Sequence, residues 1–293
     1  MIESLSQILN FRYNKKFLDW DLNHMVNDRD LLTDFPDVFN FFKIVIHHHG
    51  VEYNKIHNNH VFCVANKCSQ LMDIVKTSDF SPGGILVVAG EDDKLSHNIK
   101  YINEVKELFD TIYYEAKDIQ CDWIHATPMG VNVAYLLRAG GSKLIDIFNS
   151  NPKKDKLIGA AFGSKWPHLT DIILDRKKLE MFVKKSTIIN DIFSPPVEFF
   201  TNLSRCTFFA CPLGNGVQTP KIFECLLTET IPIVTDHFIY SEIKKLYDIP
   251  ILIINEWEDI REDTLQKFNH TDIDWQAIKS KLTVDYFYKK NLE

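Results

Sequence analysis

A glycine-rich loop at 213–219, LGNGVQT, stands between a stretch that predicts a buried strand and one that predicts a helix. The apolar run at 206–211 precedes it, and Pro220 follows, a residue well suited to the first turn of a helix. Gly214 and Gly216 would let backbone N–H groups approach an anion, and the helix N-terminus would add a favourable partial charge. The loop therefore predicts a binding site for a diphosphate.

Two charged side chains follow in the same expected helix. Glu224 lies four residues into it, where its carboxylate would accept hydrogen bonds from the two hydroxyls of a ribose. Lys221, one turn earlier, would balance the charge of a phosphate. The loop and the helix together favour a nucleoside diphosphate as the ligand.

Three consecutive carboxylates, Glu91, Asp92 and Asp93, follow an apolar run at 84–90 that predicts a strand. Clustered carboxylates raise one another's pKa, which suits a general base that takes the proton of an acceptor hydroxyl. Two other interpretations stay open. The cluster also fits a solvated acidic turn before a helix, and Glu91 with Asp93 imitates the Asp-x-Asp signature that holds Mn²⁺ on a diphosphate.

Histidines end two further expected strands. His47 and His49 close the run at 42–48 and would share one face, because neighbouring strand residues point to opposite faces. His125 closes the run at 122–127. We expect acceptor-binding roles for these three histidines and no metal site, since a metal would need further ligands.

Short β-branched runs alternate with stretches of helical period from residue 43 onward, which predicts parallel sheets of the α/β class. In the first half, strands are expected at 42–48, 84–90, 111–116, 122–127 and 142–148, and helices at 66–76, 98–109 and 130–138. In the second half, strands are expected at 156–162, 186–191, 206–211, 231–236 and 249–254, and helices at 170–184, 218–229, 239–247, 256–268 and 272–290. The polar run at 149–156 predicts a linker, so we expect domains at 1–150 and 151–293.

Composition limits the classes of function. The chain has 293 residues, with 33 Lys and Arg against 40 Asp and Glu, and its net charge of −7 leaves no excess of cations for a nucleic-acid-binding face. Its six cysteines contain no Cys-x-x-Cys pair, which is typical of reduced thiols inside a cell. No N-terminal apolar stretch reaches the roughly 20 residues of a membrane span, so we expect no membrane insertion and a cytoplasmic location.

The segment at 206–236 resembles the donor-binding half of exostosin-like glycosyltransferases, and the resemblance extends over about 156–260. That family carries a segment of the type Phe-Cys-Leu-x-Pro-x-Gly, followed by Arg-x-(Phe/Tyr)-Glu and then by Ile-Pro-Val. The matching residues here are Phe208, Pro212, Gly214, Gly216, Lys221, Phe223, Glu224, Ile231, Pro232 and Val234. The sequence departs at Lys221, where Arg is commoner, so a bidentate phosphate contact would become a point-charge contact.

The resemblance implies a GT-B architecture, in which two Rossmann-like domains face each other across a cleft. The N-terminal domain would bind the acceptor, and the C-terminal domain would bind the nucleotide sugar. The expected donor-binding residues are Gly163, Lys165, Arg176, Arg205, Pro212, Gly214, Asn215, Gly216, Thr219, Lys221 and Glu224. Among them, Lys165, Arg176 and Arg205 would neutralise the departing diphosphate.

The sequence thus predicts an enzyme of glycan biosynthesis that moves a sugar from a UDP-sugar to a hydroxyl of an oligosaccharide or glycoprotein. The reaction would be inverting, with Asp92, Asp93 or Glu91 as the base, with no tightly bound cofactor or metal and with a small donor such as UDP-xylose. A bacterial or large-virus member acting in the cytoplasm, that of the host if viral, fits the lack of an anchor. The alternatives are a Mn²⁺-dependent GT-A-like transferase that uses Glu91 and Asp93, and a non-catalytic protein that binds glycan or nucleotide.

Overall fold

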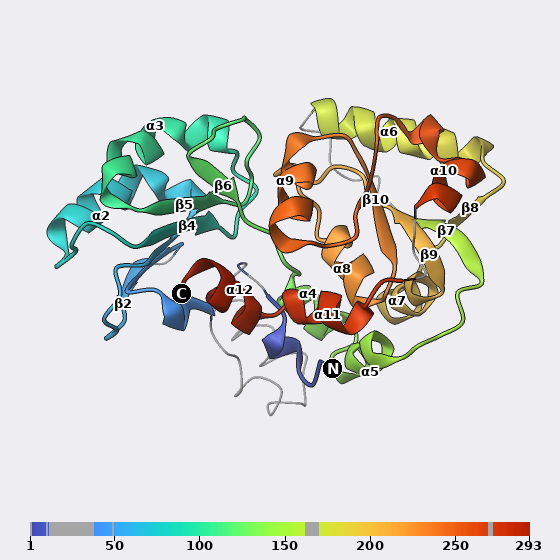
Figure 1. Cartoon of the computed structure of the whole chain (residues 1–293), viewed down its shortest axis with the longest axis horizontal. Helices are drawn as coiled ribbons and strands as arrows, with labels where there is room; N and C mark the ends of the chain where they lie inside the picture. Colours follow the sequence, from blue (N-terminus) through green and yellow to red (C-terminus); the bar gives the residue numbers. More distant parts are fainter. Residues whose placement is uncertain (1, 10, 12–37, 49, 162–169, 269–271) are drawn as a thin grey trace. The chain divides into compact units, whose positions relative to one another are not determined.

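The computed structural model describes residues 2–9, 11, 38–48, 50–161, 170–268 and 272–293. The chain forms two compact units (Figure 1). Unit 1 consists of residues 1–5, 134–215 and 219–282, and unit 2 consists of residues 6–133, 216–218 and 283–293. The predicted domain boundary at 150/151 lies inside unit 1, whereas the chain passes from unit 2 into unit 1 at 133/134.

Unit 2 contains a six-stranded mixed sheet whose strand order is β2-β1-β3-β4-β5-β6. Its strands are β1 (Ile44–His47), β2 (Gly50–Tyr53), β3 (Val61–Val64), β4 (Ile85–Ala89), β5 (Thr111–Tyr114) and β6 (Ile124–Ala126). Its helices are η3 (Val38–Phe41), η4 (Ala65–Gln70), α2 (Leu71–Thr77), α3 (Leu95–Val105), η5 (Lys106–Leu108) and α12 (Val284–Asn291). Only β2 runs antiparallel to its neighbour, and every other pair in this sheet is parallel, as predicted.

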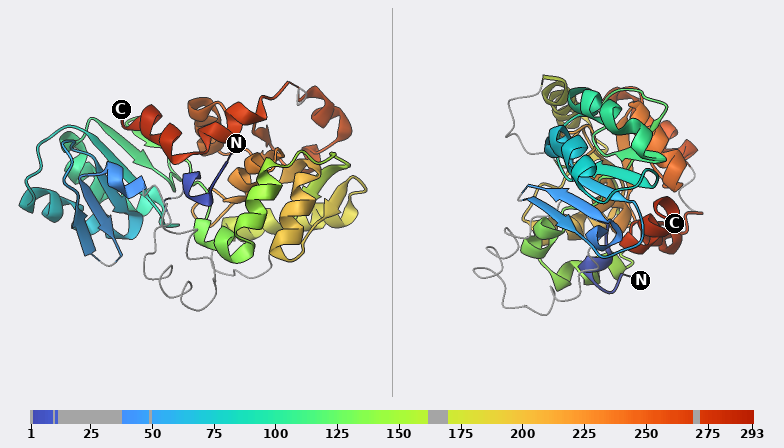
Figure 2. Two further views of the ribbon diagram at one scale, coloured as in Figure 1. Left: turned by 90° about the horizontal axis from the view of Figure 1, so that it is seen from below. Right: turned by 90° about the vertical axis from the view of Figure 1, so that its left-hand side faces the viewer.

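Strands β1, β3 and β4 of unit 2 are buried on both faces, because alternate residues point to opposite sides of the sheet and both sides are covered. Ile44, Ile46 and Leu86 pack with α2 and α3 on one face. Val45 and Phe62 pack with η3 and α12 on the other. The C-terminal helix α12, drawn in red in Figure 2, thus belongs to the core of unit 2.

Unit 1 contains a five-stranded sheet in which every strand pair is parallel. Its strands are β7 (Lys156–Ala160), β8 (Ile189–Asp191), β9 (Cys206–Ala210), β10 (Ile231–Thr235) and β11 (Leu252–Ile254). Its helices are α5 (Ser142–Asn149), α6 (Thr170–Lys185), α7 (Pro196–Ser204), α8 (Lys221–Leu227), α9 (Phe238–Tyr247), η6 (Trp257–Asp259), α10 (Glu262–Lys267) and α11 (Trp275–Lys281). Two short helices, η1 (Leu5–Gln7) and α4 (Val133–Ala139), lie where the chain passes between the units.

Helices cover both faces of this second sheet. Phe208 of β9 packs against Phe268, which follows α10, and belongs to the cluster that includes Leu179 of α6. Its neighbour Phe209 packs against Phe199 of α7 on the opposite face. Each unit therefore has the layered α/β construction that the alternating sequence pattern predicts.

Several predicted elements differ from the structure. Residues 142–148 form helix α5 rather than a strand, because the buried Leu144 and Phe148 are four residues apart, which is one helical turn. Strands β2 and β3 and helix α7 were not predicted, and α7 carries Pro196 in its first turn. The predicted helix at 272–290 is two helices, α11 and α12, which belong to different units.

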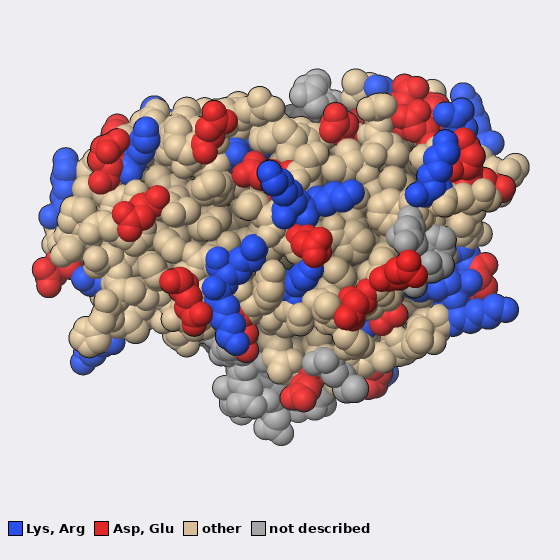
Figure 3. All heavy atoms as spheres, in the orientation of Figure 1, with Lys and Arg blue, Asp and Glu red and all other residues tan. Residues whose placement is uncertain are grey.

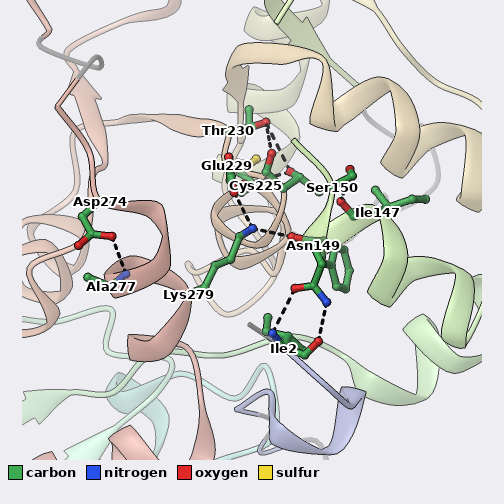
Figure 4. Close-up of polar contacts among 12 residues, drawn as sticks. Ile2, Ile147, Asn149, Ser150, Cys225, Glu229, Thr230, Asp274, Ala277 and Lys279 are labelled. Atoms are coloured by element: carbon green, nitrogen blue, oxygen red, sulfur yellow. Dashed lines mark hydrogen bonds and ion pairs between the residues drawn. The ribbon is translucent and has the colours of Figure 1, made fainter. Parts of the chain in front are cut away.

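A buried lysine forms an ion pair with Glu229 at the amino-terminal edge of the sheet of unit 1, where β10 begins (Figure 4). Lys279 of α11 is 2% exposed, and its Nζ lies 2.7 Å from Glu229 Oε1 and 2.5 Å from the carbonyl oxygen of Phe148. Asn149 then forms hydrogen bonds with both the N–H and the carbonyl oxygen of Ile2. These contacts join α11, α5 and the first residues of the chain.

On the face drawn in Figure 3, basic and acidic side chains are interspersed rather than gathered by sign. Among the described residues, no helix is both long and apolar enough to cross a membrane.

Candidate functional site

The strand order of unit 1 contains a reversal. In the order β11-β10-β9-β7-β8, the chain moves outward from β7 to β8 and then returns past β7 to β9. Ligands of open α/β sheets bind beyond the carboxyl ends of the strands that flank such a reversal. The loop that follows β9 at this point is the one that holds Pro212, Gly214 and Asn215.

Asp175 of α6 joins three segments at this carboxyl edge. Its carboxylate accepts hydrogen bonds from Leu213 N at 2.9 Å, from Trp257 Nε1 at 2.8 Å and from Thr235 Oγ1 at 3.4 Å. Burial raises the pKa of Asp175, although the three hydrogen bonds act in the opposite direction. The next residue, Arg176, donates from Nε to the carbonyl oxygen of Leu213 at 3.4 Å. The peptide groups of Leu213 are thus held on both sides by consecutive residues of one helix.

Lys221 and Glu224 form a pair on α8. The Lys221 Nζ lies 2.7 Å from Glu224 Oε2 and 4.1 Å from the centroid of the Phe199 ring. The Glu224 side chain is 3% exposed and that of Lys221 is 27% exposed. Burial lowers the pKa of Lys221, but the Glu224 carboxylate outweighs this and the net pKa is raised. Lys221 is therefore the more accessible member of the pair, and Glu224 holds it.

The middle of the glycine-rich loop, Gly216–Gln218, belongs to unit 2. Gln218 is fully buried there, and its Nε2 donates to the carbonyl oxygens of Glu115 at 2.6 Å and Thr127 at 2.8 Å. Its Oε1 accepts from Met129 N at 3.0 Å. A Cβ on Gly216 would lie 3.1 Å from both Asp92 Cα and Ala116 Cβ, so a larger residue would force these neighbours to shift by a few tenths of an ångström.

The residues that flank Gly216–Gln218 lie between β9 and α8. Pro212 and Gly214 are buried and Asn215 is half-buried. The Thr219 hydroxyl accepts from Lys221 N at 3.4 Å, near the predicted helix start, while α8 itself begins at Lys221. Whether these residues bind a diphosphate stays a prediction.

At the carboxyl edge of unit 2, His48 pairs with Glu91. The His48 Nε2 lies 2.6 Å from Glu91 Oε1, and both side chains are partly exposed, at 27% and 36%. The His48 Nδ1 faces Asn66 Nδ2 at 3.4 Å, and an amide nitrogen can only donate. The neutral imidazole therefore carries its proton on Nε2, and its Nδ1 accepts from Asn66.

The other two carboxylates of the acidic cluster have different surroundings. Asp93 Oδ1 lies 2.9 Å from His97 Nδ1, and Asp93 Oδ2 accepts from Asn98 Nδ2 at 3.0 Å, which ties the loop to α3. Asp92 lies beside Gly216. Among the described residues, no group of three or more His, Cys, Asp and Glu side chains is placed to hold a metal ion.

The predicted histidines are separated. The His47 Nε2 lies 3.2 Å from Glu52 Oε1 of β2, and the His47 side chain is nearly buried. His125 is exposed on β6, where its ring lies 5.7 Å from that of Tyr113. His49 lies outside the described residues.

The predicted cations are also separated. Arg205 precedes β9, at the amino-terminal edge of the sheet, and its guanidinium forms two hydrogen bonds with Asp155. Arg176 lies at the carboxyl edge through its contact with Leu213. Gly163 and Lys165 lie outside the described residues.

Sequence reasoning missed Asp175, Gln218 and the pairing of His48. Asp175 carried a signal, because it lies one turn before the buried Leu179 and so falls on the apolar face of α6. The pairing of His48 with Glu91 carried none, because β3 lies between β1 and β4 in the sheet.

The chain was compared with known proteins in two ways. Neither a scan against models of protein families nor a search of curated proteins finds a match for this chain.

Proposed function

We propose that this protein is an inverting glycosyltransferase of the GT-B type, in which unit 1 binds a UDP-sugar and unit 2 supplies the general base. Two features of unit 1 support the donor role. Its strand order reverses beside the loop after β9, and the residues of that loop and of α8 resemble the donor-binding segment of exostosin-like enzymes. A nucleotide is a common ligand at such a reversal.

The observation that carries the proposal is the pair of His48 and Glu91. A carboxylate that accepts the Nε2 proton fixes the tautomer of the imidazole and stabilises the imidazolium that forms when Nδ1 takes up a proton. The pair is partly exposed at the carboxyl edge of a parallel sheet, where a substrate hydroxyl has access. Its contact with Asn66 is long enough for a hydroxyl to replace it.

The proposed reaction is a single displacement. As the acceptor oxygen forms a bond to the anomeric carbon, its proton moves to His48 Nδ1. The bond between that carbon and the diphosphate oxygen breaks, and UDP leaves with the electron pair. Lys221 and Arg176 are the cations of unit 1 that would stabilise this leaving charge, which is the task of a metal in other transferases.

The test combines binding with turnover. Wild-type protein, His48→Asn and the control His57→Asn, a change at an exposed histidine of unit 2, are titrated with UDP and assayed for UDP release from a panel of UDP-sugars and glycan acceptors. We expect equal UDP affinity in all three, no effect of EDTA, and turnover of His48→Asn lowered by roughly 10²–10⁴-fold. Equal turnover of the two variants contradicts the assignment of the base. UDP binding without turnover in the wild type favours the non-catalytic alternative.

A further inference from the structure

Asp175 is a buried carboxylate whose hydrogen bonds all reach loops of one sheet edge. It is 9% exposed. Leu213 follows β9, Thr235 ends β10, and Trp257 lies in η6 after β11. One side chain of α6 therefore fixes the spacing of three neighbouring strand ends.

The donors to this carboxylate are a backbone N–H, an indole N–H and a hydroxyl, all of them neutral. The charged or titratable groups that interact with it electrostatically are Lys178 on its own helix and Tyr240 on α9, while the neighbouring Arg176 is bonded to the carbonyl oxygen of Leu213. No cation is therefore in hydrogen-bond contact with it among the described residues.

Ionisation of Asp175 works against folding. Its pKa is raised in the folded protein, so the folded state holds the proton more tightly than the unfolded state does. The contribution of this group to stability is therefore largest at low pH and decreases as the pH rises through the raised pKa. Burial of this carboxyl group is therefore only partly offset by its three hydrogen bonds, so its place in the structure is better explained by what those hydrogen bonds position.

We infer that Asp175 is a positioning residue that holds the Leu213 peptide so that the loop after β9 presents its backbone to the phosphates of the donor. This role rests on the proposed function. Leu213 immediately precedes Gly214, and its N–H and carbonyl are held by Asp175 and Arg176. With both ends of Leu213 fixed, the loop pays less ordering entropy when a ligand binds.

The variant Asp175→Asn isolates this role because it keeps the shape of the side chain. Its amide oxygen still accepts from Trp257 Nε1, but its NH₂ group cannot accept from Leu213 N. The matched control is Glu180→Gln, which neutralises an exposed carboxylate on the same helix that is paired with Lys184. A second variant, Trp257→Phe, removes one donor and leaves the bond to Leu213 in place.

Three readouts are compared in the full-length protein: hydrogen exchange of the Leu213 amide, UDP affinity by titration calorimetry, and melting temperature. For Asp175→Asn we expect faster exchange of that amide and UDP affinity weakened by about 10-fold or more, and the melting temperature reports whether the variant stays folded. Glu180→Gln should match the wild type in all three. Trp257→Phe should keep the protection of the Leu213 amide.

Two results overturn the inference: unchanged exchange of the Leu213 amide in Asp175→Asn, or unchanged UDP affinity when that exchange is faster. If the wild-type protein binds no UDP species, the proposed function fails, and the role of Asp175 toward a donor fails with it. The amide exchange then still reports separately whether Asp175 holds the loop.

Discussion

The two sheets of this protein order their strands differently, although both are built largely from parallel strands. In unit 1 the order reverses at β7 and β9, so the crossovers leave this point in opposite directions. In unit 2 the parallel strands follow one another in chain order, and α2 and α3 lie on one face. At a reversal, the loops that follow the two flanking strands run to opposite sides and leave a crevice for a ligand. A sheet without a reversal has no crevice of this kind. The candidate site of unit 1 is therefore located by the strand order of its sheet. The candidate site of unit 2 is located by the paired side chains of His48 and Glu91.

The two edges of the sheet in unit 1 differ in a related way. At the amino-terminal edge, buried Lys279 is paired with an opposite charge, Glu229. At the carboxyl edge, Asp175 accepts hydrogen bonds from neutral donors only. Removing one partner of a buried ion pair leaves an uncompensated buried charge. Neutral donors offset the burial cost of a carboxylate only in part, which agrees with the raised pKa of Asp175.

The largest change in stability is expected at the buried pair of Lys279 and Glu229. Lys279→Ala leaves Glu229, which is 15% exposed, without its cation, and should destabilise unit 1 by about 3–5 kcal/mol in urea denaturation. The control is Lys281→Ala on the same helix, whose partner Asp248 is 95% exposed, and it should cost less than about 1 kcal/mol. An equal loss of unfolding free energy in the two variants would show that the buried pair of Lys279 and Glu229 contributes no more than an exposed pair.

A smaller effect is expected at Gln218 in unit 2. Gln218→Ala leaves the carbonyl oxygens of Glu115 and Thr127 and the N–H of Met129 without this partner, which should cost about 2–3 kcal/mol. The control Gln120→Ala removes an exposed amide from the same unit. Urea denaturation of both variants measures the difference. No difference would mean that Gly216–Gln218 adds nothing to the stability of unit 2.

An effect on turnover is expected at Glu91, the carboxylate that pairs with His48. Glu91→Gln keeps an oxygen that can accept from His48 Nε2 but removes the charge that stabilises the imidazolium. We expect turnover to fall by about 10-fold, which corresponds to about 1.4 kcal/mol, with UDP affinity unchanged. Glu104→Gln, at an exposed position on α3, is the control. A change in UDP affinity without a change in turnover would show that Glu91 acts in donor binding and not in the chemical step.

The smallest effect concerns Lys154, which donates to the carbonyl oxygen of Thr228 at 3.0 Å. Burial lowers its pKa to about 8 from an ordinary value of 10.5. The unfolded state thus binds more protons between these values, and stability should rise as the pH increases from about 8 to 10.5. The expected gain is about 1 kcal/mol, because the side chain is only half-buried.

Thermal denaturation at pH 7.5, 9 and 10 compares the wild type with Lys154→Met and with the exposed control Lys153→Met. Only the first variant should lose part of the rise. An identical pH dependence in all three proteins would remove Lys154 as its source.

Much of the fold follows from local pattern. The apolar runs predicted nine strands that the structure contains, because a strand buried on both faces needs several consecutive apolar residues. Residues 142–148 were misassigned because Leu144, Ile145, Ile147 and Phe148 form a short apolar run that fits a strand as well as a helix. Strand β3 was missed although all four of its residues are buried.

Residue types and periodicity were enough to predict the α/β class, the places of most strands and the candidate residues of the loop at 213–219, since these depend on residues that are neighbours along the chain. Three contacts could be recognised only in the folded chain: His48 with Glu91, Gln218 with the backbone of unit 2, and Asp175 with Leu213. Each of these contacts joins residues that are 38 or more positions apart. Such contacts depend on strand order and on the return of the chain, which periodicity and residue type do not encode locally.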